Sequence, residues 1–573
     1  MKFNQFIDRQ DSLKRLRNAL LRTTPQFLVI YGRRRIGKST LIKEIMQDKD
    51  VYFLSDQTNE ANQRALFAKA IAYSIPRFDK VVYPDWETLL LELNDRLSER
   101  ITVCLDEFPY MVKSCTSLPS VIQKLLNGKT LKYDLIICGS SQQLMQGYVL
   151  DKREPLYGLA DEIIKLPPIP VSYIGQALNV NTIAAVEEYS IWGGIPRYWE
   201  LRADYPDMDT AIRELALDTK GILAEEPQRL LRDDLRDTIQ TSTILSIIGN
   251  GVNRITEIAS RAGKEATQIS EPLSKLRELG YIRREIPFGE SEKKSKKGIY
   301  RINDNMLQFY YRFIAPHRSI LELRRIDTVM HLINAQFTQH VGDCWEHLCR
   351  QYISGNEIDG IVYNIASRWW GKIFPEGNKE GTMIELDVVA ESFDKKHILI
   401  GECKWTNKED AQRLARTLSE KAAHLPFIKD GQEVHLVLFL KQEPEHQESI
   451  RYFLPEDIIE NLRLKFTQFE NEKGFLNKSL TLDNLAKDFE TNRDYLSKTV
   501  NELKGKNFSQ YINELRINNI VEELKNNPHL QKYTIAGIAE EAGYNNSESF
   551  TNAFKKITGT LPSYYIKALN EKI

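Results

Sequence analysis

The sequence is poor in cysteine and has no long hydrophobic run. Its six cysteines form no CxxC pair and no regular spacing, so we expect reduced thiols in a cytoplasmic protein, without a disulfide framework or a zinc site. Apolar runs such as FLVIY at 27–31 are far too short to span a bilayer, and the first ten residues contain no apolar signal core. We therefore expect no membrane association.

Neither sign of charge is in excess, because 78 Lys and Arg residues face 79 Asp and Glu residues. The chain as a whole then creates no positive field that attracts nucleic acid, and any DNA binding must come from local patches. The chain has 573 residues, too many for one hydrophobic core, so several domains are expected.

Residues 1–170 alternate short apolar runs with longer amphipathic stretches. Four runs read as strands buried on both faces: FLVIY (27–31), VYFL (51–54), ITVCLD (101–106) and LIICGSS (135–141). The amphipathic stretches between them read as crossover helices. This alternation predicts a parallel α/β sheet.

Four further regions follow, so the expected fold class is multidomain α/β. A helical region is predicted at 171–234 and contains GGIPRYW. Three helices and a two-stranded ribbon at 235–330 predict a winged helix, with Gly263 in its tight turn and Gly280 at the end of the third helix. The lysines of EKKSKKG (292–298) are expected at the tip of its wing. A mixed α/β block is predicted at 331–445. The tail at 455–573 reads as helical throughout, with two helix-turn-helix units and with helix caps expected at Thr481, Thr491, Thr534 and Ser547.

The stretch YGRRRIGKST contains the pattern GxxxxGK[ST], and it follows a predicted strand and opens a predicted helix. Successive backbone N–H groups in such a loop form a nest for phosphates. Lys38 is expected to neutralise phosphate charge, and the Ser39 hydroxyl to ligate Mg²⁺, so ATP and Mg²⁺ are the expected cofactors. The residues assigned to this nucleotide site are Gly32, Arg35, Gly37, Lys38, Ser39 and Thr40.

Two carboxylates end the predicted strand in LDEFPY. Asp106 is expected to hold the Mg²⁺ shell, and Glu107 to polarise the attacking water, which makes ATP hydrolysis the expected reaction. Ser140 and Ser141 end the next predicted strand, where they either sense a γ-phosphate or simply cap the strand. The three arginines at 33–35 either form a solvated rim, or one of them reaches a neighbouring subunit's nucleotide or the chain's own helical domain.

Six segments in fixed order resemble the archaeal-type ATPase family, a STAND-like branch of the AAA+ NTPases: FIDRQDSLKRL, YGRRRIGKST, LDEFPY, CGSSQQLM, EPLYG and GGIPRYW. The resemblance covers about residues 6 to 445, because that family continues into a winged helix and a nuclease-like domain. It implies ATP binding with Asp8 and Arg9 near the adenine, and a nucleotide-sensing role for GGIP. Members often carry Arg after LYG, where this chain has Leu159 and Ala160.

A second group of charged residues lies in IELDVVA and ILIGECKW. Asp387 falls on one predicted strand, while Glu402 and Lys404 project from the same face of the next. With Glu346 from the preceding helix, the carboxylates could form a Mg²⁺-binding cup for phosphodiester hydrolysis. The arrangement resembles the PD-(D/E)xK nuclease superfamily, although Leu386 replaces the name-giving proline. Catalytic cleavage and mere binding both remain open here.

The tail segment IAEEAGYNNSESFTNAFKKITG resembles the AraC/XylS DNA-binding domain. Ser547 is expected to cap a helix that buries Phe550 and Phe554. The resemblance implies two recognition helices in successive major grooves of double-stranded DNA. It assigns base contacts to Arg493, Asp494, Tyr495 and Lys498 in the first unit and to Asn546, Glu548, Ser549 and Asn552 in the second, with Lys555 and Lys556 nearer phosphates.

Three functions are compatible with these motifs. The first is an ATP-controlled, sequence-specific transcriptional regulator that acts on DNA as a homo-oligomer. The second is an ATP-gated, Mg²⁺-dependent nuclease that its tail delivers to DNA. The third is a transcription factor fused to an ATPase module without coupling. The first is preferred, because it uses the two most specific motifs in the chain.

Overall fold

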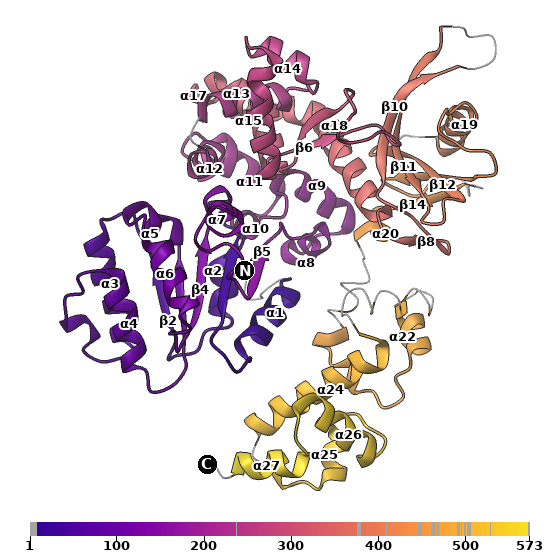
Figure 1. Cartoon of the computed structure of the whole chain (residues 1–573). Coiled ribbons are helices and arrows are strands. Elements are labelled where there is room, and N and C mark those ends of the chain that lie inside the picture. Colours follow the sequence, from indigo (N-terminus) through magenta and orange to yellow (C-terminus); the bar gives the residue numbers. More distant parts are fainter. Residues whose placement is uncertain are drawn as a thin grey trace. The chain divides into compact units, whose positions relative to one another are not determined.

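The computed structural model describes residues 8–235, 238–374, 380–407, 410–444, 450–459, 466, 469–489, 493, 496–497, 500, 506–527 and 529–570. The chain divides into two compact units, which are described separately below with the element labels of Figure 1. The first unit combines Met1–Asn356 with Tyr363–Pro455. The second combines Glu357–Val362 with Glu456–Ile573.

A parallel five-stranded sheet with the order β2-β3-β4-β1-β5 organises the N-terminal part of the first unit. Its strands are β1 (Phe27–Tyr31), β2 (Val51–Leu54), β3 (Thr102–Asp106), β4 (Asp134–Gly139) and β5 (Glu162–Lys165). Every residue of β1, β3 and β4 is buried, as expected for central strands covered on both faces. The four predicted strands are confirmed. The short edge strand β5 was not predicted.

Helices pack on this sheet and supply large aromatic side chains to its core. They are α1 (Gln10–Leu20), α2 (Lys38–Lys43), α3 (Glu60–Ala72), α4 (Trp86–Arg96), α5 (Phe108–Ser114), α6 (Leu118–Asn127) and α7 (Gln142–Leu150). Phe67, Trp86 and Phe108 are at most 1% exposed, and burial of each contributes roughly 1.5–3 kcal/mol. Asn59 and Asp85 accept hydrogen bonds from N–H groups in the first turns of α3 and α4, which fixes where these helices begin.

A helical region follows and is tied together by a buried ion pair between Arg202 and Glu188 at 2.7 Å. Its elements are η2 (Val171–Tyr173), α8 (Ile174–Leu178), α9 (Thr182–Trp192), α10 (Pro196–Ala203), α11 (Met208–Ala211), η3 (Ile212–Leu217) and α12 (Glu226–Asp234). Gly193, Gly194 and Ile195 separate α9 from α10. A Cβ on Gly194 would lie 2.2 Å from the Ile169 carbonyl oxygen, so only glycine fits there.

The next segment is a winged helix, as the sequence predicts. Three helices precede its two-stranded ribbon: α13 (Thr238–Gly249), α14 (Ile255–Arg261), α15 (Ala266–Glu278), β6 (Ile282–Glu285) and β7 (Ile299–Ile302). Gly263 and Gly280 adopt positive φ of 65° and 77° at the turns where the sequence places them. The chain continues through α16 (Asn305–Phe309), the π-helical η4 (Tyr310–Ile314), η5 (Ala315–His317) and α17 (Arg318–Glu322).

The long helix α18 (Ile326–Ile353) leads into a mixed five-stranded sheet with the order β10-β11-β12-β13-β14. Its strands are β10 (Ser367–Ile373), β11 (Thr382–Glu391), β12 (His397–Lys404), β13 (Glu433–Leu440) and β14 (Arg451–Phe453). The first three run antiparallel, while β12, β13 and β14 are parallel. The crossover between β12 and β13 contains α19 (Ala411–Ala422), and α20 (Pro455–Ile459) follows the sheet.

The second unit is mainly helical. It contains β8 (Glu357–Ile358), β9 (Ile361–Val362), η6 (Gly474–Leu476), α22 (Leu482–Asp488), α24 (Phe508–Asn526), η7 (Leu530–Lys532), α25 (Ile535–Glu541), α26 (Ser547–Thr558) and α27 (Pro562–Asn570). Helix α24 buries Tyr511 in one hydrophobic cluster and Ile520 in another. One helix thus joins two small cores, as the predicted tandem arrangement requires.

The expected cap of α26 is wrong by one residue. Asn546, not Ser547, is the N-cap, because its backbone is extended and its side chain accepts the N–H of Ser549 at 2.8 Å. The expected caps Thr481 and Thr534 are confirmed by hydrogen bonds of 3.1 Å each, whereas Thr491 lies outside the described residues. Across the described ranges, no helix is long and apolar enough to cross a bilayer.

Candidate functional site

The phosphate loop, residues 32–37, connects β1 to α2. Arg35 and Gly37 adopt positive φ of 67° and 94°, and a Cβ on Gly32 would lie 2.9 Å from a backbone oxygen of Leu166. The Lys38 ammonium is buried and donates to the carbonyl oxygens of Gly32 and Arg33, at 3.1 Å each. The lysine expected to contact phosphate therefore folds back onto its own loop. Thr40 lies on α2 with an exposed side chain.

Asp106 lies beside this loop, because parallel strands end at one edge of the sheet. The Ser39 hydroxyl donates to Oδ2 of Asp106 at 2.8 Å. Mg²⁺ prefers oxygen ligands, and these two adjacent oxygens fit that ion. The Tyr52 hydroxyl donates to the same carboxylate oxygen, and burial, assisted by Asp106, raises the pKa of Tyr52. No sequence pattern singles out Tyr52, which is one polar residue within an apolar strand.

Glu107 is held by the next strand of the sheet. Its Oε2 accepts hydrogen bonds from the Ser140 hydroxyl at 2.9 Å and from the Ser140 N–H at 3.2 Å. The Ser55 hydroxyl donates to the Glu107 carbonyl oxygen at 2.6 Å, and the Glu107 backbone has a positive φ of 55°. The Ser141 hydroxyl is buried and has no partner among the described residues. Ser140 is therefore adjacent to the carboxylate expected to polarise water.

Asp8 and Arg9 precede α1 with positive φ of 58° and 83°. The Arg9 guanidinium is buried and donates to the carbonyl oxygens of Ile36 at 3.3 Å and Pro167 at 2.6 Å. Burial lowers the pKa of Arg9, and Asp8 partly offsets this effect. Arg9 therefore contacts the phosphate loop directly, and the assignment of both residues to adenine remains a prediction.

Two of the three loop arginines reach other parts of the first unit. Arg33 is buried, its Nη1 lies 2.5 Å from Oδ2 of Asp304, and its guanidinium stacks 5.0 Å from the ring centroid of Tyr281. Arg35 pairs with the buried Glu226 of α12 at 2.8 Å. Of the alternatives for these arginines, contact with the chain's own helical region describes Arg35, whereas Arg33 contacts the winged-helix segment. A solvated rim describes neither of them.

The nuclease-like residues lie on neighbouring elements. Asp387 on β11 accepts a hydrogen bond from the N–H of Cys403 on β12 at 2.9 Å. On β12, the Glu402 carboxylate pairs with Lys404 at 2.9 Å and with Lys421 of α19 at 3.1 Å. Burial by itself lowers the pKa of Lys404, but Glu402 more than compensates, so the net shift is upward. Glu402 is thus bound by two ammonium groups.

Glu346 on α18 lies between two arginines. Its carboxylate is 3.7 Å from Arg350 and 3.5 Å from Arg368, and both arginines also reach Glu285 of the wing. Burial raises the pKa of Glu346, and the charge of Asp387 raises it further. Across the described ranges, the ligand oxygens of Glu346, Asp387 and Glu402 do not all come within 4.8 Å of one another. In this arrangement the three carboxylates do not fit around one Mg²⁺ ion.

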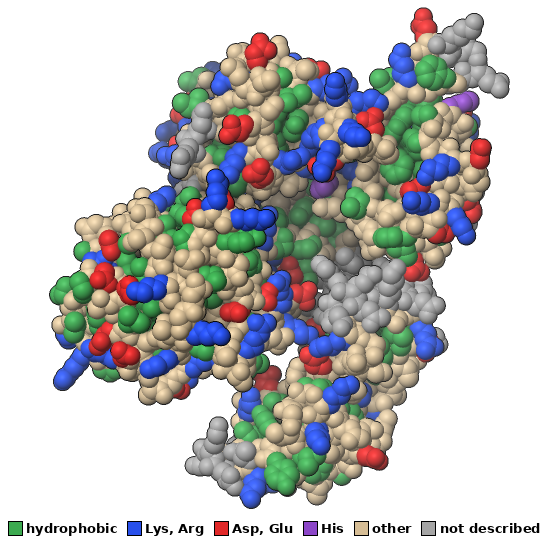
Figure 2. All heavy atoms as spheres, viewed as in Figure 1, with side chains coloured by type: hydrophobic (Ala, Val, Ile, Leu, Met, Phe, Trp, Pro, Cys, Tyr) green, Lys and Arg blue, Asp and Glu red, His purple; other side chains and the backbone are tan. Residues whose placement is uncertain are grey.

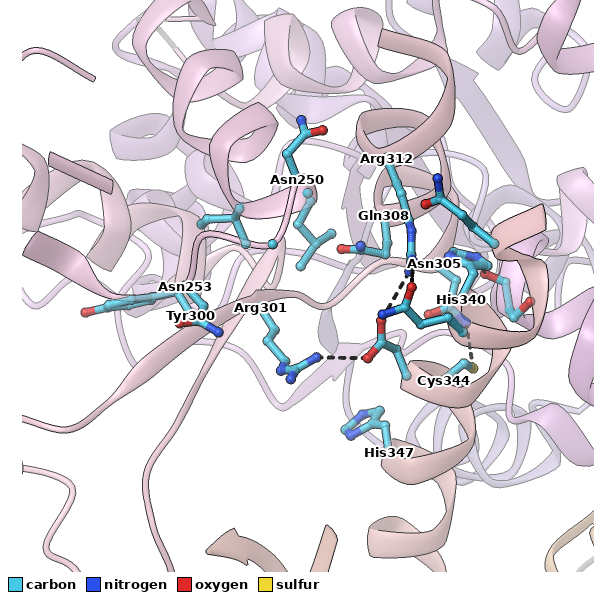
Figure 3. Close-up of a pocket in the computed structure, with 18 of the residues that line it drawn as sticks. Asn250, Asn253, Tyr300, Arg301, Asn305, Gln308, Arg312, His340, Cys344 and His347 are labelled. Carbon is cyan, nitrogen blue, oxygen red and sulfur yellow. Dashed lines mark hydrogen bonds and ion pairs between the residues drawn. The ribbon is translucent and has the colours of Figure 1, made fainter. Parts of the chain in front are cut away.

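A polar cavity of about 570 Å³ lies between the winged helix and α18 (Figure 3). Three arginines and one carboxylate, that of Asp343, are among its lining residues. Arg301 of β7 and Arg312 of η4 each approach Asp343 at 3.3 Å. Asn305, which also lines the cavity, directly follows Asp304, the partner of Arg33 in the phosphate loop. Asp343 thereby fastens the winged helix to α18.

The second helix-turn-helix of the tail presents a polar face. Six residues assigned to DNA are exposed: Asn546, Glu548, Ser549, Asn552, Lys555 and Lys556. Phe550 and Phe554 are fully buried on the opposite face of α26. In the first helix-turn-helix of the tail, Arg493 lies 3.6 Å from Asp483, while Asp494, Tyr495 and Lys498 lie outside the described residues. Acidic and basic side chains are interspersed on the visible face of each unit (Figure 2).

Three family models match separate parts of the chain. Residues 6–198 match an ATPase domain predominantly from Archaea. Residues 310–415 match a family described as "Archaea bacterial proteins of unknown function", and residues 485–568 match a helix-turn-helix domain. The chain therefore carries an archaeal-type ATPase domain, a domain of that second family and a C-terminal AraC-type helix-turn-helix domain. These domains imply binding of nucleotide and of DNA.

Two curated relatives each match a part of the chain. An uncharacterized protein of Methanocaldococcus jannaschii is 28% identical over 461 residues, which is 79% of this chain and 99% of the relative. The uncharacterized transcriptional regulatory protein YesN of Bacillus subtilis is 35% identical over 91 residues, which is 16% of this chain. The matched part spans only 24% of YesN.

Two solved structures are similar to separate parts of the chain. A Walker-type ATPase of Pyrococcus abyssi is 18% identical, and the match covers 54% of this chain and 97% of that one, with a TM-score of 0.41. The C-terminal domain of the response regulator YesN from Fusobacterium nucleatum is 22% identical, and the match covers 18% of this chain and 99% of that one, with a TM-score of 0.17. The expected fold class, a parallel P-loop-like sheet, a mixed-sheet domain and a helical helix-turn-helix tail, is confirmed.

Proposed function

We propose that this protein is an ATP-controlled, sequence-specific DNA-binding regulator. The pairing of an ATPase domain with an AraC-type helix-turn-helix supplies both activities. The observation that carries the proposal is the buried ion pair between Arg33 of the phosphate loop and Asp304 of the winged-helix segment. This ion pair connects the phosphate loop directly to the winged-helix segment.

The connection works through the backbone of the loop. Lys38 now donates to the carbonyl oxygens of Gly32 and Arg33. The phosphates of a bound nucleotide compete for the same ammonium group, so binding releases these carbonyls and lets the loop move. The Arg33 side chain transmits that movement to Asp304, which caps α16 by accepting the N–H of Leu307 at 2.6 Å.

Further ion pairs extend the connection through the first unit. Arg35 joins the loop to Glu226 on α12. Arg301 and Arg312 join the winged helix to Asp343 on α18. Coupling requires an element with two arrangements that both sites bias, and the winged helix is our candidate for that element.

In this proposal the tail reads DNA through the exposed face of α26. Because the chain carries nearly balanced charge, non-specific affinity for phosphates is modest, and base contacts must supply most of the discrimination. We therefore propose that two copies act together on double-stranded DNA, with ATP and Mg²⁺ bound at Lys38, Ser39 and Asp106. Homo-oligomerisation doubles the number of base contacts in one complex.

The test is selection of bound DNA from a random pool by the full chain, with and without ATP, for wild type and Lys38→Ala. We expect Lys38→Ala to lose at least about tenfold in ATP affinity, because it removes a charge-assisted contact with phosphate. Its melting temperature without nucleotide should stay within a few degrees of wild type. Lys43→Ala, on the same helix and exposed, is the matched control.

Two outcomes separate the alternatives. If no DNA sequence is enriched in either nucleotide state, the regulator proposal fails. If wild type and Lys38→Ala bind the enriched DNA equally well, and ATP changes neither affinity, the tail acts without coupling to the ATPase.

A nuclease of PD-(D/E)xK type is the second candidate. In its favour, Asp387 lies on the strand next to Glu402 and Lys404, as that resemblance requires. Against it, arginines and lysines already neutralise the carboxylates. Mg²⁺- or Mn²⁺-dependent cleavage that Asp387→Ala or Lys404→Ala abolishes would establish this activity. DNA left intact by wild type with ATP and either ion would count against it.

A further inference from the structure

Two histidines and a glutamate converge where the parallel strands β12 and β13 begin. His397 is the first residue of β12 and pairs in register with Glu433, the first residue of β13. His435 follows Glu433 by two positions, so both side chains leave the same face of the sheet. The register therefore brings two imidazoles and one carboxylate to one point on the domain surface.

The distances between their ligand atoms are those of a metal site. Nδ1 of His397 lies 3.1 Å from Nε2 of His435 and 3.4 Å from Oε2 of Glu433. Nε2 of His435 lies 3.9 Å from Oε1 of Glu433. Tetrahedral Zn²⁺ with bonds of about 2.0–2.1 Å places its ligands about 3.3 Å apart. Within the described parts of the chain, no other three His, Cys, Asp or Glu residues bring their ligand atoms within 4.8 Å of one another.

The chemistry of the donors selects the class of metal. Imidazole nitrogens suit Zn²⁺ and similar transition-metal ions, whereas Mg²⁺ and Ca²⁺ prefer oxygen ligands. The side chains of His397, Glu433 and His435 are 23%, 67% and 30% exposed. Solvent therefore reaches the site and can supply a water as a fourth ligand.

We propose that His397, Glu433 and His435 bind one divalent transition-metal ion of the zinc class. The ion clamps the starts of β12 and β13 and adds to the backbone pairing of these parallel strands, which the α19 crossover connects along the chain. Glu402 lies five residues along β12, about 17 Å away. The metal site is thus separate from the carboxylates of the nuclease-like group. It also differs from the expectation of no zinc site, which rested on the cysteines alone.

The experiment uses the untagged full chain, stripped with a chelator and titrated with ZnCl₂ in a calorimeter and in thermal unfolding. We expect one equivalent to bind and to raise the melting temperature. His397→Ala and His435→Ala should each lower the affinity for Zn²⁺ at least about tenfold. Even substitution of residues that only hydrogen-bond to metal ligands lowers metal affinity by that much. His424→Ala, an exposed histidine beyond α19, is the control and should bind like wild type.

Glu433→Gln is a further variant. Because the Glu433 side chain is exposed, this substitution should leave the sheet intact, and it should also weaken Zn²⁺ binding. Co²⁺ in place of Zn²⁺ should give the visible absorption of tetrahedral coordination in wild type and not in His435→Ala. The proposal is overturned if wild type binds no Zn²⁺ at micromolar concentration, or if all variants bind equally. In either case the 3.1 Å contact is only a hydrogen bond between two imidazoles.

Discussion

The Ser140 hydroxyl donates a 2.9 Å hydrogen bond to the carboxylate of Glu107, across the ends of two adjacent strands. The backbone N–H of Ser140 donates to the same oxygen. If Glu107 polarises the attacking water, these bonds hold it in a resting position. The nucleotide site is then built to hydrolyse slowly until something moves Glu107, which suits a switch.

Ser140→Ala should accordingly raise the steady-state rate of ATP hydrolysis with little change in ATP affinity. Loss of one hydrogen bond to a charged group is worth about 1.5 kcal/mol, so the increase should be up to about tenfold. Ser141→Ala removes a neighbouring hydroxyl that has no partner among the described residues, and serves as the control. A fall in rate for Ser140→Ala would instead favour a γ-phosphate sensor.

Arg33→Ala should destabilise the first unit and abolish the effect of ATP on DNA affinity. It leaves the Asp304 carboxylate buried without its partner, which costs about 3–5 kcal/mol. Arg34→Ala removes the same charge from an exposed position of the loop and should cost much less.

The double variant Arg33→Ala/Asp304→Ala checks this reasoning in the same denaturant titration. Because it removes both charges, its loss of unfolding free energy should be clearly smaller than the sum of the two single losses. Strict additivity would show that the pair does not interact in solution.

His340 should make the first unit sensitive to acid. Burial, assisted by the nearby Arg312, lowers the pKa of His340 to about 4, and its Nε2 lies 3.0 Å from the carbonyl oxygen of Ser190. The unfolded chain binds a proton at this site below about pH 6.5 while the folded chain does not, so stability is complete above that pH and falls below it.

When the pH is lowered from about 7 to about 5, His340 alone should reduce the unfolding free energy by about 2 kcal/mol. His340→Gln keeps a donor for the Ser190 carbonyl oxygen and does not titrate. Over the same pH range, its unfolding free energy should therefore fall by about 2 kcal/mol less than that of wild type. His424→Ala, which removes an exposed histidine, should follow wild type. Equal pH dependence for His340→Gln and wild type would contradict the prediction.

Substitutions in α26 should separate base contacts from phosphate contacts. Lys555→Ala and Lys556→Ala should each weaken binding to all sequences and reduce the salt slope by about one. Asn552→Ala should cost about 1–3 kcal/mol on the preferred sequence only. The measurement is fluorescence anisotropy at several salt concentrations, with the exposed Lys525→Ala of α24 as the control. A uniform loss for Asn552→Ala would place it on phosphates.

The sequence predicted those parts of the fold and site that local rules control. Ser39 and Asp106 meet because parallel strands end at a common edge, and the two motifs reveal those ends. The one-residue error at Asn546 arose because Asn and Ser are equally good caps, and only the backbone conformation chooses between them.

Long-range pairs were beyond such rules. Arg33 and Asp304 are 271 positions apart, and no spacing rule connects a phosphate loop with the start of α16. His397 and His435 are equally isolated in the sequence, and only the strand register brings them together. The run of three arginines predicts contact with a helical domain as one alternative, but no local rule identifies the partner residue.

The 28-residue helix α18 sets a practical limit on dissecting this protein. At about 1.5 Å per residue it is a rod of about 42 Å, and it carries both Asp343, bound by the winged helix, and Glu346, three residues further on. A fragment that starts at residue 331, the predicted domain boundary, would truncate this rod and lose both arginine partners of Asp343. Expression clones of the mixed-sheet domain should therefore begin before the winged helix, not within α18.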